Sequence, residues 1–224
     1  MKCPLCEQEF LATYTIREVF FGRSPYPLCV ACRESFVKKS DPACPNCAKS
    51  GETGTCADCK RWKLEYPNRH FDHHALFEYN DAMHLYFSRY KFFGELHLSH
   101  AFKQELLLAL KHEKALLIPI PISRTTLRRR GFNQVEELLK SSGLPYIHAL
   151  RKKETPRAQS ELTRKERMTA PNPFFLLEEC GSKLADRHLL LIDDVYTTGR
   201  TLNHARDILE TAHPASIRTF SLAR

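Results

Sequence analysis

The pattern of apolar and polar positions changes near residue 60. Beyond that point, short apolar runs alternate with segments whose apolar residues recur every three or four positions. This alternation is typical of an α/β domain with a mainly parallel sheet flanked by helices. It predicts strands at 75–79, 116–121, 146–150, 188–193 and 217–222, and helices at 81–93, 95–111, 133–141 and 201–211.

The first 60 residues contain eight of the nine cysteines, arranged in four Cys-x-x-Cys pairs. The pairs are Cys3/Cys6, Cys29/Cys32, Cys44/Cys47 and Cys56/Cys59, and Cys180 stands alone. Two thiolates at this spacing can bind one metal ion, and two such pairs complete a tetrahedral site. Four pairs therefore predict two metal sites of four cysteines each, with zinc as the first choice and iron in a rubredoxin-like site as the second.

A disulfide framework is the alternative interpretation, but the rest of the chain holds a single cysteine, which fits a reducing compartment. The sequence leaves the grouping of the pairs open. Sequential use of the pairs gives a double zinc ribbon, which we favour, and an interleaved cross-brace is the other arrangement. Because thiolates fill all four positions at each metal, we expect structural rather than catalytic zinc. We expect a double zinc-ribbon domain at 1–62 and an α/β domain at 63–224.

Composition indicates a folded protein without membrane insertion. Hydrophobic residues make up 42% of the chain and charged residues 27%, which is enough apolar surface to form a core. The longest apolar runs are much shorter than the ~20 residues of a membrane helix. The first residues lead directly into Cys3, without the apolar stretch of a secretory signal. We therefore expect a cytoplasmic protein.

The positive charge of the chain is concentrated in one stretch. The formal net charge is +8, and residues 122–170 hold 12 Lys and Arg against 5 Asp and Glu. A run of cations on its own is usually a solvated face, but this degree of concentration favours a phosphate-rich partner.

The most specific segment runs from a buried strand into a loop rich in Thr and Gly. Four aliphatic residues at 189–192 precede Asp193 and Asp194, and the loop at 197–201 follows. In open parallel sheets, ligands bind at the carboxyl ends of the strands. The N–H groups and hydroxyls of such a loop, with the positive end of the next helix, form an anion cradle. The two carboxylates can accept hydrogen bonds from vicinal hydroxyls, so the segment predicts a sugar-phosphate site.

This segment resembles the phosphoribosyl-pyrophosphate (PRPP) signature of type I phosphoribosyltransferases. It departs from that signature at Tyr196, where the residue is usually aliphatic. The resemblance implies a catalytic site in which Asp193 and Asp194 hold the 2′ and 3′ hydroxyls of the ribose, and in which magnesium accompanies PRPP. It assigns the 5′-phosphate to five consecutive residues: Thr197, Thr198, Gly199, Arg200 and Thr201.

The wider pattern is similar to the competence protein F (ComF) family, and most like its ComFC members. It comprises the four Cys-x-x-Cys pairs, the proline-containing strand end at 119–123 and a series of basic and polar residues: Arg124, Arg128, Arg130, Arg151, Thr155, Gln159, Arg164 and Arg167. The resemblance covers essentially the whole chain. It implies a pyrophosphate loop at 119–124, with Ser123, Arg124 and Arg128 as PRPP-binding residues, and a mobile lid at 151–167 that begins at Arg151.

Three functions are consistent with these features. The family resemblance implies a PRPP-binding protein, or a phosphoribosyltransferase of unnamed acceptor, that handles incoming single-stranded DNA in natural transformation beside a DNA helicase of the ComF system. The second is a catalytically inactive zinc-containing adaptor that holds single-stranded DNA by charge and aromatic stacking. The third is a PRPP-sensing regulator.

Overall fold

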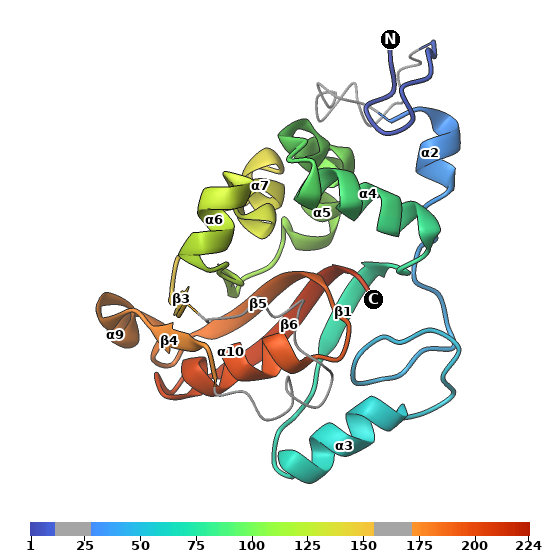
Figure 1. Ribbon diagram of the computed structural model, residues 1–224. Coiled ribbons are helices and arrows are strands. Elements are labelled where there is room, and N and C mark those ends of the chain that lie inside the picture. The colour runs from blue at the N-terminus through green and yellow to red at the C-terminus, as the bar shows by residue number, and fades with distance from the viewer. Residues whose placement is uncertain (12–27, 155–171) are drawn as a thin grey trace.

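A parallel sheet forms the centre of the molecule. The computed structural model describes residues 1–11, 28–154 and 172–224. The strand order is β1 (His73–Phe77), β6 (Ser216–Ala223), β5 (His188–Val195) and β2 (Leu116–Pro119), all parallel. Strands β3 (Leu150–Lys152) and β4 (Phe174–Leu176) form a separate antiparallel pair (Figure 1). The parallel sheet predicted from the alternating pattern is confirmed.

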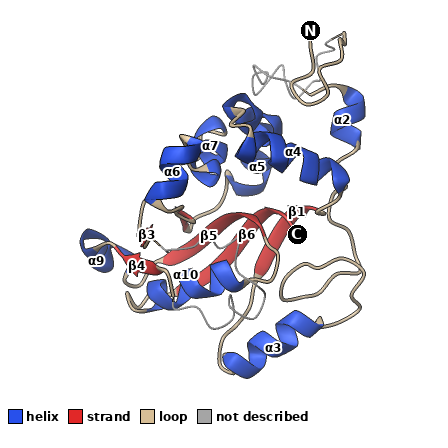
Figure 2. Cartoon of the chain, viewed as in Figure 1, coloured by secondary structure: helices blue, strands red, loops and turns tan. Residues whose placement is uncertain are grey.

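Helices cover both faces of this sheet (Figure 2). One layer contains α4 (Asp81–Phe92), the 3₁₀ helix η1 (Leu96–Phe102), α5 (Lys103–Leu110), α6 (Arg124–Arg130) and α7 (Gln134–Ser141), and the other contains α10 (Arg200–Glu210). Outside these layers lie α2 (Val30–Glu34), α3 (Ala57–Glu65), the 3₁₀ helix η3 (Glu178–Cys180) and α9 (Gly181–Leu184). Within the described residues, every helix falls short of the length and apolar character that a membrane span requires.

Alternate residues of β5 enter two different hydrophobic cores. Leu190 and Ile192 belong to the core formed with α4, α5 and α7, whereas Leu189 and Leu191 belong to the core beneath α10. All four side chains are buried. A strand covered on both faces needs apolar residues at every position, which explains the continuous aliphatic run in the sequence.

Each core also contains cysteines of the N-terminal segment. Cys3 and Cys29 pack in the first core, and the four cysteines between residues 44 and 59 pack in the second. Phe36 strengthens the first connection, because its ring lies 4.8 Å from that of Phe102 on η1. Helix α3 runs without a break through residues 62 and 63. The domain boundary at that position stays a prediction.

Two predicted elements take a different form. The helix predicted at 95–111 begins as the 3₁₀ helix η1, whose three-residue turn places both Leu98 and Ala101 in the core. The strand predicted at 146–150 is wrong for most of its length, since β3 starts at Leu150. In its place, Ile147 donates one backbone hydrogen bond to the Leu117 carbonyl at 3.0 Å.

Helix α6 and strand β4 were missed by the sequence pattern. Helix α6 has only seven residues, and capping rather than periodicity defines it. The Ser123 hydroxyl accepts a hydrogen bond from Thr126 N at 3.2 Å, and Gly131 ends the helix with a φ of 86°. Strand β4 is three residues long, too short for a period-two pattern to be visible.

Candidate functional site

The two adjacent acids lie near the carboxyl end of β5, at the edge of the sheet where parallel strands place ligand sites. Asp194 is 5% exposed, and its Oδ1 lies 2.8 Å from the Lys91 ammonium of α4. Its Oδ2 is buried and has no hydrogen-bond partner among the described residues. A buried carboxylate oxygen without a partner costs free energy, so this atom is suited to accept a hydrogen bond from a bound ligand.

Asp193 occupies a different electrostatic environment. Its Oδ1 accepts a hydrogen bond from the Asp194 N–H at 2.9 Å. Burial and the neighbouring Asp194 carboxylate raise the pKa of Asp193 to about 7, against the opposing effects of the Asp194 N–H, Lys91 and Lys152. The protonated form of Asp193 is therefore favoured compared with that of an exposed aspartate.

Lys91 and Lys152 supply positive charge beside the acids. Lys152 falls within the predicted lid at 151–167, whereas the sequence pattern gave no sign of Lys91. Lys152 comes from β3, and burial lowers its pKa while the Asp193 carboxylate opposes that effect. Lys91 stands in the last turn of α4, where nothing in the local pattern separates it from a surface lysine. Only the fold brings both ammonium groups to the end of β5.

The loop at 197–201 leads from β5 into α10. Gly199 has a φ of +82°, and α10 begins at the next residue without a side-chain cap. A Cβ atom at position 199 would lie 2.2 Å from the Tyr196 hydroxyl oxygen, so this position requires glycine. The Arg200 N–H donates to the Thr198 hydroxyl at 3.4 Å, and Gly199 itself offers no side chain to cap the helix. N–H groups in the first turn of a helix are donors that can bind an anion. The structure thus places Thr197, Thr198 and Gly199 in the loop that follows the acids, and Arg200 and Thr201 in the first turn of α10.

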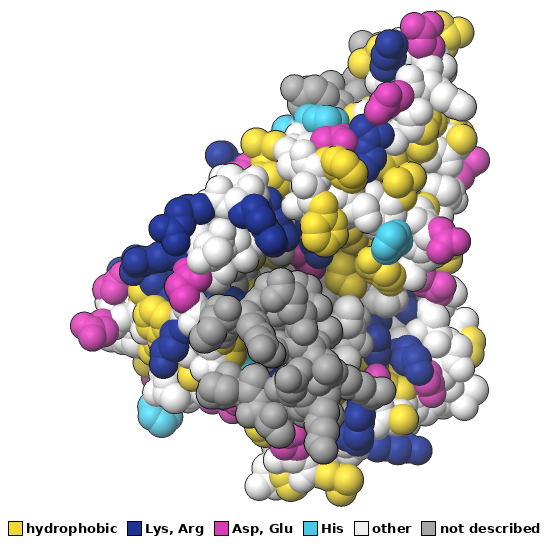
Figure 3. Space-filling model, viewed as in Figure 1, with side chains coloured by type: hydrophobic (Ala, Val, Ile, Leu, Met, Phe, Trp, Pro, Cys, Tyr) yellow, Lys and Arg dark blue, Asp and Glu magenta, His cyan; other side chains and the backbone are white. Residues whose placement is uncertain are grey.

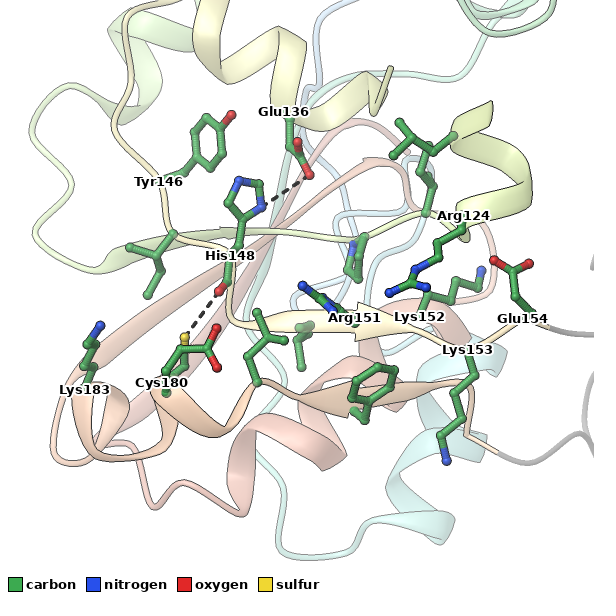
Figure 4. A pocket seen from close by; sticks show the side chains of 18 residues that line it. Arg124, Glu136, Tyr146, His148, Arg151, Lys152, Lys153, Glu154, Cys180 and Lys183 are labelled. Atoms are coloured by element: carbon green, nitrogen blue, oxygen red, sulfur yellow. Dashed lines mark hydrogen bonds and ion pairs between the residues drawn. The ribbon is translucent and has the colours of Figure 1, made fainter. Parts of the chain in front are cut away.

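Two of the basic residues assigned to pyrophosphate, Arg124 and Arg151, lie at one pocket. Arg124, at the start of α6, and Arg151, on β3, both line an open pocket of about 1070 Å³. Figure 4 shows their side chains directed toward the same part of that cavity. Ser123 caps α6 at the start of that helix. Arg128 is exposed in the last turn of the same helix and is not among the residues that line the pocket, although its charge acts on the pocket residue Glu154.

Lys152 connects the two groups, because it lines the pocket and its charge also acts on Asp193. The lid predicted at 151–167 begins within β3, which pairs with β4. The lid residues Thr155, Gln159, Arg164 and Arg167 lie outside the described residues. The lid therefore stays a prediction.

The cysteines form two groups in the sequential order. Cys3, Cys6, Cys29 and Cys32 make the first group, and Cys44, Cys47, Cys56 and Cys59 make the second, with all ligand atoms of a group within 4.8 Å of one another. Zn–S bonds of ~2.3 Å in a tetrahedron place the sulfurs about 3.8 Å apart. The Sγ atoms of Cys6 and Cys29 are 3.7 Å apart, and those of Cys47 and Cys56 are 3.6 Å apart. Both groups therefore fit a zinc ion.

The two cysteine groups repeat one local design. In each, the first pair lies on a turn closed by a residue with positive φ, Glu7 or Ala48. The second pair begins at the N-cap of a short helix, α2 or α3. In each group, the N–H of the N-cap cysteine donates to the first sulfur of the group at 3.4 Å.

Comparison with known proteins agrees with these features. The profile of the phosphoribosyl transferase domain matches residues 128–224. The chain is 38% identical over 226 residues to competence protein ComFC of Streptococcus pneumoniae, with 100% of both chains covered. It is 30% identical over 235 residues to competence protein ComFC of Bacillus subtilis, covering 99% of this chain and 94% of the other. It is also 24% identical over 212 residues to competence protein F of Haemophilus influenzae, covering 88% and 90%.

The fold and the strand-end acids define a phosphoribosyltransferase-type α/β protein that carries two groups of four cysteines. Because the identity to the pneumococcal protein extends over the full length of both chains, this chain belongs to the ComFC family of competence proteins. The family identified from the sequence pattern is thus confirmed.

The raised pKa of Asp193 gives the stability of the protein a defined pH dependence. The folded state keeps the Asp193 proton up to about pH 7, whereas the unfolded chain loses it near pH 4. The free energy of unfolding therefore falls as the pH rises through this window.

We expect Asp193→Asn to stabilise the protein more at pH 8 than at pH 6, by about 1 kcal/mol. Urea unfolding at both pH values measures this difference, with the exposed Asp186→Asn as the control. A gain that is equal at the two pH values would contradict the raised pKa.

The two separate cysteine groups predict how many zinc ions each cysteine variant should bind. We expect two zinc ions per wild-type chain and one in Cys56→Ser/Cys59→Ser, because that change removes two of the four ligands of the second group. Cys180→Ser should keep two, since Cys180 lies in neither group. Elemental analysis by mass spectrometry after gel filtration measures the ratio. Loss of both ions in the double variant, with the fold retained, would indicate shared rather than separate sites.

Proposed function

We propose that the strand-end site binds PRPP or a closely related sugar phosphate. The observation that carries the proposal is the buried Oδ2 of Asp194, which lacks a partner among the described residues and belongs to the strand that leads directly into the N-terminus of α10. Together they offer an acceptor for a ribose hydroxyl and donors for a phosphate at one end of β5. Asp193 and Asp194 would take the 2′ and 3′ hydroxyls, and residues 197–201 would take the 5′-phosphate.

The pyrophosphate of PRPP would lie toward α6 and β3. Ser123, Arg124, Arg128 and Arg151 are the residues proposed to act there, and the placement of Arg124 and Arg151 at one pocket supports this assignment. Magnesium bound with PRPP would neutralise charge on the pyrophosphate. If the protein transfers the phosphoribosyl group, Arg124 and Arg151 would stabilise the leaving group electrostatically.

We further propose that this chain acts in natural transformation and handles incoming single-stranded DNA in the cytoplasm, together with a DNA helicase of the same system. Full-length similarity to two proteins named competence protein ComFC supports the biological role. The pocket supports the DNA interaction, because its lining holds more cations than carboxylates and includes the aromatic rings of Tyr146 and Phe175. The cations are Arg124, Arg151, Lys152, Lys153 and Lys183, and the carboxylates are Glu136, Glu154 and Glu179. Figure 3 shows further Lys and Arg side chains over α6. Cations that follow a phosphate backbone and rings on which bases stack are typical of single-strand binding.

We expect Asp194→Asn to weaken PRPP binding by about tenfold or more, because the neutral amide is a poorer acceptor and no longer balances Lys91. Calorimetric titration of the zinc-loaded protein with PRPP and Mg²⁺ measures the affinity. The exposed Asp186→Asn is the matched control and should bind as the wild type does. Unchanged affinity in a folded Asp194→Asn protein would refute the site.

We expect single-stranded DNA and PRPP to compete, since both are assigned to the surface formed by α6 and β3. Arg151→Glu/Lys153→Glu should weaken binding of a short oligonucleotide and lower its salt dependence by about two ion equivalents. The matched control is Lys60→Glu/Lys63→Glu on α3, which makes the same change in charge away from the pocket. Fluorescence anisotropy at several salt concentrations, with and without PRPP, provides both readouts. DNA affinity that survives the first double variant would place the DNA surface elsewhere.

A further inference from the structure

Two side chains hold the phosphate loop from its outer side. The indole N–H of Trp62 donates to the Thr198 carbonyl at 2.7 Å. The Arg224 guanidinium donates from Nη1 to the Thr197 carbonyl, also at 2.7 Å. Two consecutive peptide groups of the loop are therefore fixed by donors that are remote from the loop in sequence.

These hydrogen bonds set the direction of the loop N–H groups. In a trans peptide, the carbonyl oxygen and the N–H of the next residue point in opposite directions. With the Thr197 and Thr198 carbonyls held by Arg224 and Trp62, the N–H groups of Thr198 and Gly199 point away from those donors. That orientation leaves the two N–H groups available to an anion in the cradle.

Both side chains belong to the surroundings of the second cysteine group. Trp62 is buried in α3, one turn after Cys59, and Cys56 is the N-cap of that helix. Arg224 Nη2 lies 3.5 Å from Cys47 Sγ. The same cysteines pack in one core with Tyr196, whose ring lies 4.7 Å from the Arg224 guanidinium.

The first cysteine group has no such connection among the described residues. Its cysteines pack in the other core, with Phe36 and the helices α4 and α5. The Arg89 side chain of α4 donates to the Leu5 carbonyl at 2.6 Å, which ties this group to the helical layer and not to the phosphate loop. The first cysteine group therefore serves as a control, because loss of its metal should not affect the loop at 197–201.

We propose that Trp62 and Arg224 are positioning residues that couple metal binding at Cys44, Cys47, Cys56 and Cys59 to phosphate binding by residues 197–201. A metal ion in this group fixes the start of α3 and the position of Cys47. It thereby fixes the donors that orient the Thr198 and Gly199 N–H groups. The proposal rests on the proposed phosphate site, and it adds that the second metal, unlike the first, sets the affinity of that site.

Coupling of this kind is reciprocal. If zinc at the second group raises the affinity for PRPP by some factor, PRPP raises the zinc affinity of that group by the same factor. Equilibrium competition with a chelator should therefore show two zinc ions of similar affinity without PRPP, and one of them bound more tightly when PRPP and Mg²⁺ are added. The ion that gains affinity should be absent from the Cys56→Ser/Cys59→Ser variant.

The variants Trp62→Phe and Arg224→Lys test the positioning residues directly. Each should weaken PRPP binding by about fivefold, the effect of losing or distorting one hydrogen bond, while both zinc ions are retained. The matched control is Tyr66→Phe at the C-cap of α3, which removes a 3.1 Å hydrogen bond to Asp207, about two turns along α10 from the loop. It should leave PRPP affinity unchanged. If Trp62→Phe fails to fold, Arg224→Lys carries the test.

A second readout does not require PRPP. Amide hydrogen exchange of the segment 196–201 should be slower in the zinc-loaded protein than in Cys56→Ser/Cys59→Ser, and should change little in Cys29→Ser/Cys32→Ser. If the wild type binds no PRPP but shows this pattern, the coupling holds and the proposed ligand is wrong. If PRPP binds, and both its affinity and the loop exchange are the same in Trp62→Phe, Arg224→Lys and the wild type, the coupling is refuted.

Discussion

The placement of two adjacent carboxylates at the end of β5, Asp194 buried and Asp193 half-buried, is the constraint on which the rest of the site depends. An unpaired buried charge is unstable, so the fold must supply compensating groups. It does so from three directions: Lys91 from α4, Lys152 from β3 and the backbone N–H of Asp194. The compensation is incomplete, because burial still raises the pKa of Asp193 and one oxygen of Asp194 has no partner among the described residues. A ligand with vicinal hydroxyls is suited to complete it.

The parts of the fold and site that could be predicted are those marked by residues close together in the sequence. The aliphatic run before Asp193, the acids and the Thr/Gly loop lie within thirteen consecutive residues, so strand, loop and helix could be predicted together. The cysteine spacing likewise predicted two metal sites that the structure groups in sequential order. By contrast, Lys91, Trp62 and Arg224 reach the site only through the fold. In the sequence each is an ordinary lysine, tryptophan or arginine, and no spacing rule marks it.

Both cysteine groups pack against the α/β part of the chain. Each group shares a core with one layer of helices, and the two cores lie on opposite faces of the sheet. A small metal-binding turn contributes little apolar surface alone, but here its thiols pack directly against the larger domain. Metal binding in these groups can therefore stabilise the helices on either side of the sheet as well as residues 1–62. It also offers a physical route by which the second group acts on the loop at 197–201.

The central claim is that the end of β5 and the loop that follows it form a phosphate site, and hydrogen exchange of the zinc-loaded protein tests it most directly. With PRPP and Mg²⁺ present, amide exchange should slow in the segment 194–201, where the first N–H groups of α10 and the Thr198 and Gly199 N–H groups lie. Protection confined to the pocket formed by α6 and β3, with the exchange of 194–201 unchanged, would contradict the account and place the anion site at the basic surface alone.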